Sequence, residues 1–145
     1  MKLYLMQHGE AKTKEEDPER PLTDRGKGDV GRVAACIARA GIQIDQIRHS
    51  GKRRAEDTAN IVAQHLQAQE TVVAVSGINP NDDIEPIAEA LLSKKQSVML
   101  VGHLPFLSRL ASYLLTGNAE QGFVQFQMGG IVCLERQEEK WIIRW

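Results

Sequence analysis

The stretch LYLMQHGEA, residues 3–11, joins an apolar run to a histidine that is followed directly by glycine. The run Leu3–Met6 predicts a buried strand, because consecutive apolar and aromatic residues suit a strand that is covered on both faces. The histidine at its end is either a packed structural residue or a group that takes part in chemistry. The function of the chain depends on which of these two descriptions fits His8.

Strand-like segments alternate with amphipathic helical segments along the rest of the chain. The predicted strands are 45–49, 71–75 and 97–103, and the segment 129–145 predicts a closing hairpin of two strands. The predicted helices lie between Thr23 and Gly41, around 55–66, at 83–92 and around 107–114. This alternation indicates an α/β fold, a three-layer α/β/α sandwich with a mostly parallel central sheet and an antiparallel C-terminal hairpin. We expect residues 1–145 to form a single domain.

Composition excludes several classes of function. The net charge of −1 gives no overall field that would attract nucleic acid or an anionic membrane. No apolar run approaches the roughly 20 residues of a membrane span, and the start lacks the pattern of a signal peptide. Cys36 and Cys133 have no metal-ligand or redox spacing, so we expect both to be reduced core residues. These features predict a cytoplasmic protein with no cofactor and no metal, and with neither nucleic acid nor membrane as a partner.

Polar residues follow three of the predicted strands. His8 follows the first strand, the segment from Ser50 to Arg54 follows the second, and His103 follows the fourth. Because ligands of parallel sheets bind at the carboxyl ends of the strands, we expect these side chains to converge at one edge. Ser50 has no general base near it in the sequence, so we do not expect it to be a nucleophile.

This combination of side chains suits phosphoryl transfer, which needs a nucleophile in line with the phosphorus and donors around its oxygens. A backbone carbonyl that accepts from one ring nitrogen of His8 would leave the other free to attack. Gly9 would allow the backbone to approach an anion. Arg54 can donate to two phosphate oxygens at once, and His103 would add a donor, most effectively when protonated.

Four motifs occur in one order: LYLMQHGEA at 3–11, RPLTDRG at 20–26, SGKRRAEDTA at 50–59 and VGHLPFLSRL at 101–110. Together they resemble the histidine phosphatase superfamily, in particular its small SixA-type phosphohistidine phosphatases, over nearly the whole chain. The resemblance implies the phosphoglycerate mutase-like fold, with His8 as the phosphorylated nucleophile and Arg54 and His103 in the phosphate pocket. It also places Arg20 at the phosphate, a role that its spacing in the sequence does not predict.

One position departs from the signature of that family, which is Arg-His-Gly where this chain has Gln7-His8-Gly9. Arginine offers a fixed charge and two parallel donors, whereas glutamine offers one neutral amide group for the phosphate. The loss of a charge-assisted hydrogen bond worth about 1.5–3 kcal/mol would slow catalysis roughly ten- to a hundredfold. Gln7 is therefore compatible with a slower enzyme and does not require an inactive one.

The general acid is the second feature in which this chain is compared with the superfamily. Larger members of the superfamily use a carboxyl group to protonate an alkoxide leaving group, and Asp82 or Asp83 stands where such an acid could be offered. The segment NPNDD, 79–83, equally suits a turn and a helix N-cap. SixA-type members are thought to need no dedicated acid, because imidazole is a better leaving group than an alkoxide.

The favoured function is that of a metal-independent phosphohistidine phosphatase acting on a phosphorylated, histidine-containing protein through a covalent phospho-His8 intermediate. The expected occupant of its site is phosphate or a similar oxyanion. One alternative is a small-molecule phosphomonoesterase with Asp82 or Asp83 as the acid. The other is a domain of low or no activity that binds phosphate or phosphoproteins. In that case Gln7, in place of the arginine of the family signature, would indicate the loss of activity.

Overall fold

The computed structural model describes residues 1–122 and 124–145, and within them six strands form one sheet in the order β3-β2-β4-β1-β5-β6. The strands are β1 Lys2–Gln7, β2 Gln46–His49, β3 Val72–Ala74, β4 Val98–Gly102, β5 Ile131–Gln137 and β6 Lys140–Ile143. The pairs β1–β4, β4–β2 and β2–β3 are parallel, whereas β5 runs antiparallel to both β1 and β6. The predicted sheet and its closing hairpin are thus confirmed.

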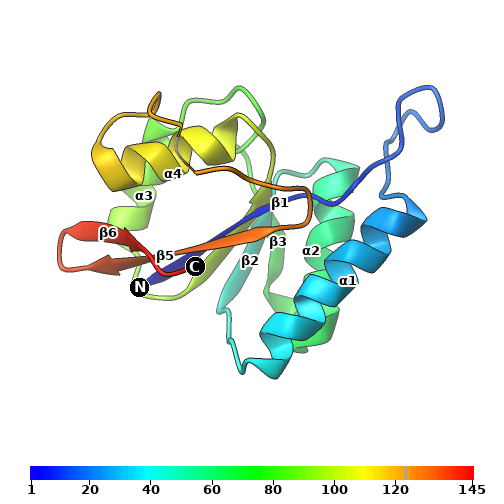
Figure 1. Ribbon diagram of the computed structural model, residues 1–145, viewed down its shortest axis with the longest axis horizontal. Helices are drawn as coiled ribbons and strands as arrows, with labels where there is room; N and C mark the ends of the chain where they lie inside the picture. Colours follow the sequence, from blue (N-terminus) through cyan, green and yellow to red (C-terminus); the bar gives the residue numbers. More distant parts are fainter. Residues whose placement is uncertain (123) are drawn as a thin grey trace.

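The helices form the two outer layers. They are α1 Asp24–Arg39, α2 Arg53–Leu66, α3 Glu85–Leu92 and α4 Phe106–Thr116, with a short 3₁₀ helix, η1, at Gln69–Thr71. Figure 1 shows α1 and α2 on one face of the sheet and α3 and α4 on the other, which confirms the predicted three-layer sandwich. No helix that the structure describes combines the length and the apolar character that a membrane crossing requires.

The central strands bury both of their faces. In β1, Leu3 and Leu5 join the core under α3 and α4, whereas Tyr4 and Met6 join the core under α1 and α2. All five residues of β4 are buried in the same alternating way. Because successive side chains of a strand point to opposite faces, a continuous apolar run is what a doubly covered strand requires.

Helix ends mostly follow the predicted signals. The Thr23 side chain caps α1 by accepting from Gly26 N at 3.0 Å, and Gly117, at φ +77°, ends α4. The helix expected from residue 83 begins two residues later. The reason is that Asp83 accepts a hydrogen bond from Glu85 N with its side chain and remains outside the helix.

The expectation that both cysteines are core residues was wrong for Cys36. Cys133 on β5 is buried, but Cys36 is exposed on α1. It directly precedes the buried Ile37, so its side chain lies about 100° around the helix from the apolar stripe.

The connections of β2 and β4 define the place where a ligand is expected. β2 continues through α2 to β3 on one side of the sheet, whereas β4 continues through α4 to β5 on the other. Because α2 and α4 cover opposite faces (Figure 1), these neighbouring connections diverge, and in α/β folds such a divergence is where a binding crevice is expected. In α/β sheets this crevice, at the carboxyl ends of the strands, is the usual binding position.

The loop after His8 is fixed to the first turn of α1. Thr23 N donates to the Glu10 carbonyl at 3.0 Å, and the Thr23 hydroxyl donates to the Glu10 carboxylate at 3.0 Å. A Cβ on Gly26 would lie only 2.2 Å from that same Glu10 carbonyl oxygen. The contact between loop and helix therefore requires glycine at position 26.

Replacement of Gly26 by alanine tests this contact. We expect Gly26→Ala to lower the free energy of unfolding by about 3 kcal/mol, because the Glu10 backbone has to move away. The matched control is Gly28→Ala in the same helix, where the nearest atom to a new Cβ is 3.5 Å away on the Arg32 side chain. That variant should gain about 0.5–1 kcal/mol from helix propensity. The free energy of unfolding of both variants is measured with urea. Equal changes in Gly26→Ala and Gly28→Ala would show that the contact between Gly26 and Glu10 does not require glycine.

Candidate active site

The ends of β1 and β4 place two histidines side by side. His8 follows β1, and its backbone N–H donates to Gly102 O at 3.0 Å, which extends the pairing of the two strands. His103 follows β4, and the centroids of the two imidazole rings are 5.1 Å apart. The convergence predicted from the strand ends is therefore observed for His8 and His103.

His8 is held in one tautomer. Its Nδ1 lies 2.7 Å from the Gly9 carbonyl oxygen, which can only accept, so Nδ1 carries the hydrogen and Nε2 keeps a lone pair. Burial lowers the pKa of His8 below 6.5, the bond to Gly9 opposes this, and the charges of Arg54 and Arg20 lower the pKa further. This geometry fits the neutral imidazole that the sequence predicted, and the carbonyl that orients the ring is that of Gly9.

Gly9 has a different role from the expected one. Its N–H donates to Thr58 Oγ1 at 3.0 Å and is therefore not free to bind an anion. A Cβ at this position would lie 2.7 Å from Val30 Cγ2 on α1, so the missing side chain allows the strand end to pack against the helix. Gly9 thus serves the site by orienting His8 rather than by binding phosphate through its own N–H.

His103 is bonded through one nitrogen only. Its Nε2 lies 2.7 Å from Ser50 Oγ, and its Nδ1 is buried without a partner among the described residues. Burial, followed by the charges of His8 and Arg54, lowers the pKa of His103 to about 3. Without an anion beside it the ring is therefore neutral near pH 7, so the protonated form that would donate most effectively requires a bound dianion. A dianion beside the ring would raise this pKa.

Two arginines bring positive charge to the same space. Arg54 lies in the first turn of α2 with its Nε buried and unpartnered, and burial together with the charge of Arg20 lowers its pKa. Arg20 has a φ of +53° and donates from Nε to the Lys12 carbonyl at 3.0 Å. Among the described residues, no carboxylate forms an ion pair with either arginine. Both charges remain available to an anion.

The neighbouring Arg53 is used structurally. It bonds to Asp57 on α2 at 2.8 Å and to Glu19 at 3.2 Å. Asp57 also accepts from Leu22 N at 3.1 Å, so this network ties the segment 20–23 to the first turn of α2. The network explains how Arg20 is held near the site.

A hollow of about 350 Å³ opens beside these arginines. The residues that line it are predominantly basic: Lys14, Pro18, Glu19, Arg20, Lys52, Arg53 and Arg54. Lys14 and Lys52 are both exposed, and the structure gathers them at this opening. A concentration of positive charge there attracts anionic ligands despite the negative net charge of the chain.

Unpartnered buried atoms mark the site as well. Gln7 Oε1, Arg54 Nε and His103 Nδ1 are all buried and have no partner among the described residues. Two more buried atoms without a hydrogen bond, Glu135 Oε2 and Trp141 Nε1, lie on β5 and β6. Buried polar atoms are normally paired, so the unpartnered nitrogens of Arg54 and His103 indicate a place for a polar ligand. Gln7 ends β1, and because its Oε1 is an acceptor, only its amide NH₂ group can donate to an oxyanion.

The donors and the nucleophile together suit a tetrahedral oxyanion. Arg20 and Arg54 supply charge, and a neutral His8 supplies a nucleophilic nitrogen beside them. Over residues 1–122 and 124–145, no three His, Cys, Asp or Glu side chains are grouped as a metal site would require. The charges and the nucleophilic nitrogen therefore suit the binding and attack of a phosphoryl group.

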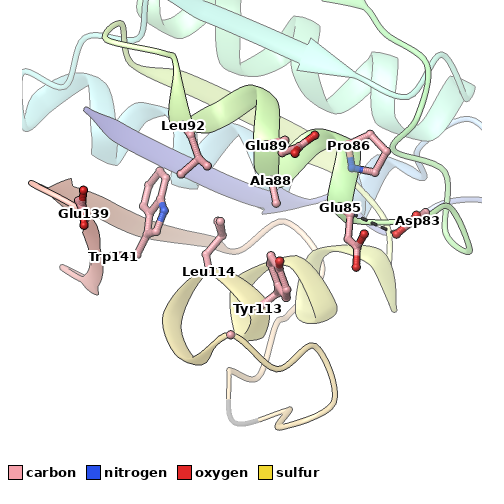
Figure 2. Close-up of a pocket in the computed structure, with 11 residues that line it drawn as sticks. Asp83, Glu85, Pro86, Ala88, Glu89, Leu92, Tyr113, Leu114, Glu139 and Trp141 are labelled. Carbon is pink, nitrogen blue, oxygen red and sulfur yellow. Dashed lines mark hydrogen bonds between the residues drawn. The ribbon is translucent and has the colours of Figure 1, made fainter.

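Asp82 and Asp83 make the bonds that a turn and a helix cap require. Asp82 Oδ2 accepts from Asn79 N at 2.8 Å, and Asp83 Oδ1 accepts from Glu85 N at 3.1 Å. Figure 2 shows Asp83 at the rim of a separate hollow, which lies between α3, α4 and the Trp141 side chain of β6. The structure does not bring Asp83 to the basic hollow beside Arg54.

Sequence reasoning missed two supporting hydroxyl groups in the segment 50–59. Thr58 accepts from Gly9 N and donates to the Arg54 carbonyl at 2.8 Å, so it joins the two motifs that carry His8 and Arg54. Ser50 meets His103, which is far away in the sequence. A threonine at a position of the apolar face of a predicted helix was a usable signal for Thr58. No local pattern in the sequence shows that Ser50 contacts His103.

Known proteins resemble this chain in sequence and in fold. Residues 3–77 match the histidine phosphatase superfamily (branch 1). Phosphohistidine phosphatase SixA of Escherichia coli (strain K12) is 25% identical over 140 residues, which are 93% of this chain and 87% of that protein. The structure of the protein histidine phosphatase SixA complexed with tungstate superposes with a TM-score of 0.88 at 24% identity, over 100% of this chain and 95% of the other. The alpha-ribazole phosphatase from Shigella flexneri gives a TM-score of 0.77 at 17% identity, over 99% and 95% of the two chains.

The family match contains three of the four motifs, with His8, Arg20 and Arg54 among its residues. His103 lies beyond the matched segment, in the part of the chain that the structural similarity covers. The matched segment makes up more than half of the sequence, and the superposition confirms the phosphoglycerate mutase-like fold. The chain therefore belongs to the histidine phosphatase superfamily, branch 1.

Proposed function

We propose that the protein is a phosphohistidine phosphatase that removes the phosphoryl group from a phosphorylated protein without a metal ion. The observation that carries this proposal is the neutral His8, whose Nδ1 is bonded to Gly9 O and whose Nε2 is free to attack. Arg20 and Arg54 lower the His8 pKa by their charge and have no carboxylate partner in the described part of the chain. The similarity in sequence to phosphohistidine phosphatase SixA and in fold to a structure of SixA supports the choice of substrate. The cytoplasmic location predicted from the sequence is part of the proposal.

The reaction has two displacements at phosphorus. In the first, His8 Nε2 forms a bond to phosphorus while the bond between phosphorus and the substrate imidazole breaks. The leaving nitrogen keeps the electron pair and is protonated from water. In the second, a water oxygen attacks phosphorus and the bond to Nε2 breaks. The proton that this water loses passes to the solvent and balances the one taken up by the leaving imidazole, so inorganic phosphate and neutral His8 are released. Arg20, Arg54 and the Gln7 amide stabilise the phosphoryl oxygens in both steps.

The leaving group favours a phosphohistidine over a phosphate ester. An alkoxide needs a proton from a general acid, and Asp82 and Asp83 are engaged in turn and capping bonds. An imidazole leaves without such an acid because its nitrogen carries the electron pair far more readily. The basic opening lined by Lys14 and Lys52 also suits an acidic protein surface next to the phosphohistidine.

Replacement of the nucleophile gives the first test. We expect His8→Ala to abolish hydrolysis of a phosphohistidine protein and to leave the unfolding curve nearly unchanged, because the substitution removes the attacking nitrogen. The matched control is His65→Ala, which removes an exposed histidine of α2 and should leave turnover intact. Released phosphate is measured without added metal, with p-nitrophenyl phosphate in parallel.

The comparison of the two substrates separates the possible functions. Preference for the phosphohistidine protein supports the proposal, whereas preference for p-nitrophenyl phosphate indicates a small-molecule phosphatase. Binding of phosphate without turnover of either substrate indicates a binding domain. Unchanged hydrolysis in His8→Ala would rule out His8 as the nucleophile.

Gln7 provides the second test. We expect Gln7→Arg to raise kcat roughly ten- to a hundredfold, because it restores a charge-assisted bond of about 1.5–3 kcal/mol to the phosphoryl group. The control variant Gln7→Leu keeps the size without the amide and should lower kcat. Steady-state kinetics on the phosphohistidine protein measure both. An unchanged or lower kcat in Gln7→Arg would show that the site is built around a neutral residue.

The pH dependence provides the third test. His8 attacks only when it is neutral, and it becomes protonated as the pH falls through its pKa, which lies below 6.5. We therefore expect kcat/KM to be retained at pH 6.5 and to decline only at more acidic pH. Phosphate release is followed across the pH range, with an enzyme-free blank at each pH and the titration of the substrate phosphoryl group measured separately by NMR. A decline centred above pH 6.5 that the substrate does not explain would contradict this assignment.

A further inference from the structure

We propose that Ser50 is a positioning residue that sets which nitrogen of His103 carries the proton, so that His103 donates to a phosphoryl oxygen from Nδ1. The observation behind it is the distance of 2.7 Å between Ser50 Oγ and His103 Nε2. The inference rests on the phosphatase function proposed above, because it gives His103 a defined task at the phosphoryl group.

The contact joins the ends of two neighbouring strands. The register of the parallel pair β2–β4 aligns His49 with Val101, so Ser50 and His103 both lie just beyond the paired residues. This is also where the connections through α2 and α4 leave in opposite directions. The hydroxyl and the imidazole are therefore placed by the sheet itself and not by a loose surface loop.

The hydrogen count favours one tautomer of His103. Ser50 Oγ accepts from Lys52 N at 3.3 Å, and its own hydrogen has no acceptor among the described residues other than His103 Nε2. When the hydroxyl donates to Nε2, the single hydrogen of the neutral ring has to be on Nδ1. The other tautomer would leave both the hydroxyl hydrogen and the Nδ1 lone pair without a partner.

The tautomer decides whether His103 attracts or repels a phosphoryl group. Its Nδ1 is buried and unpartnered, and the ring lies 5.1 Å from that of His8 between centroids. An N–H at Nδ1 can donate to a phosphoryl oxygen, whereas a lone pair at Nδ1 would face the oxygen with like charge. Without an anion in the site, burial lowers the pKa of His103 to about 3, so the ring that meets the phosphoryl group near neutral pH is neutral and carries a single hydrogen.

Variants that remove or keep the hydroxyl group of residue 50 test the proposal, and both phosphate binding and turnover are measured. We expect Ser50→Ala to lower kcat/KM roughly tenfold and to weaken inhibition by inorganic phosphate by a similar factor, while Ser50→Thr retains most of both. The control is Ser112→Ala on α4, which removes a buried hydroxyl that donates to Asn118 O at 2.7 Å away from the site. That variant should lose stability to urea but keep kcat/KM and phosphate inhibition.

The tautomer itself is read from the imidazole ¹⁵N shifts of His103 with saturating inorganic phosphate. We expect Nδ1 to carry the proton in the native protein and in Ser50→Thr, and Ser50→Ala to shift toward a proton on Nε2. An Nε2 proton in the native protein, or the same tautomer in native protein and Ser50→Ala, would overturn the proposal, even with a loss of activity. If the alanine variant does not fold, Ser50→Cys, a weak donor of similar size, replaces it.

These readouts separate this inference from the proposed function. The ¹⁵N shifts and the binding of inorganic phosphate, measured directly by calorimetry, need no turnover. If the native protein hydrolyses no phosphohistidine protein, the proposed function fails, and the role of Ser50 is still decided by the tautomer and by phosphate affinity.

Discussion

Two imidazoles and two guanidinium groups share one small space at the carboxyl ends of β1, β2 and β4, and the described residues provide no carboxylate partner for the two arginines. Because like charges repel in a partly buried space, the histidines stay neutral: burial and the arginine charges lower the pKa of both. A phosphoryl dianion balances Arg20 and Arg54 when it binds and so relieves their repulsion. The same crowding that keeps His8 nucleophilic therefore makes the space selective for an anion.

This crowding persists because the surrounding backbone holds each group in place. The Gly9 carbonyl fixes His8, and Thr58 holds the N–H of Gly9 and the carbonyl of Arg54 together. Asp57 binds both Leu22 N and Arg53, which keeps the segment that carries Arg20 against α2. Charges that repel one another are thus kept close by hydrogen bonds among neutral groups and by ion pairs farther out.

The sequence was most informative where one position determines the chemistry. A doubly buried strand followed by polar residues predicted the ends of β1, β2 and β4, and with them His8, Arg54 and His103. Arg20 came from the family resemblance, because its place depends on a positive φ and on contacts with a distant helix rather than on spacing. Cys36 shows the limit of helical periodicity, since one residue along the chain separates a buried side chain from an exposed one.

Contacts between residues that are distant in the sequence, and the protonation that follows from burial, could not be predicted from the sequence. Ser50 looked inert because its partner, His103, is on another strand, and the pairing of β2 with β4 brings them together. His103 was expected to donate most effectively when protonated, but burial keeps its ring neutral without an anion, and burial is a property of the assembled core. The sequence also did not show why position 9 needs glycine. A Cβ at this position would meet Val30 on α1, so the glycine serves the packing of the strand end against the helix.

Gln7 can be understood from the same balance of charge. In the proposed first step, the phosphoryl group passes from one imidazole to another, so the bond that forms at His8 is of the same kind as the bond that breaks. Such a transfer needs less stabilisation of developing charge than the expulsion of an alkoxide does. The neutral amide at the end of β1 therefore leaves the proposed reaction possible with weaker stabilisation of the phosphoryl oxygens. An arginine at position 7 would add a charge-assisted bond that strengthens in the transition state, which raises kcat without being a requirement for the reaction.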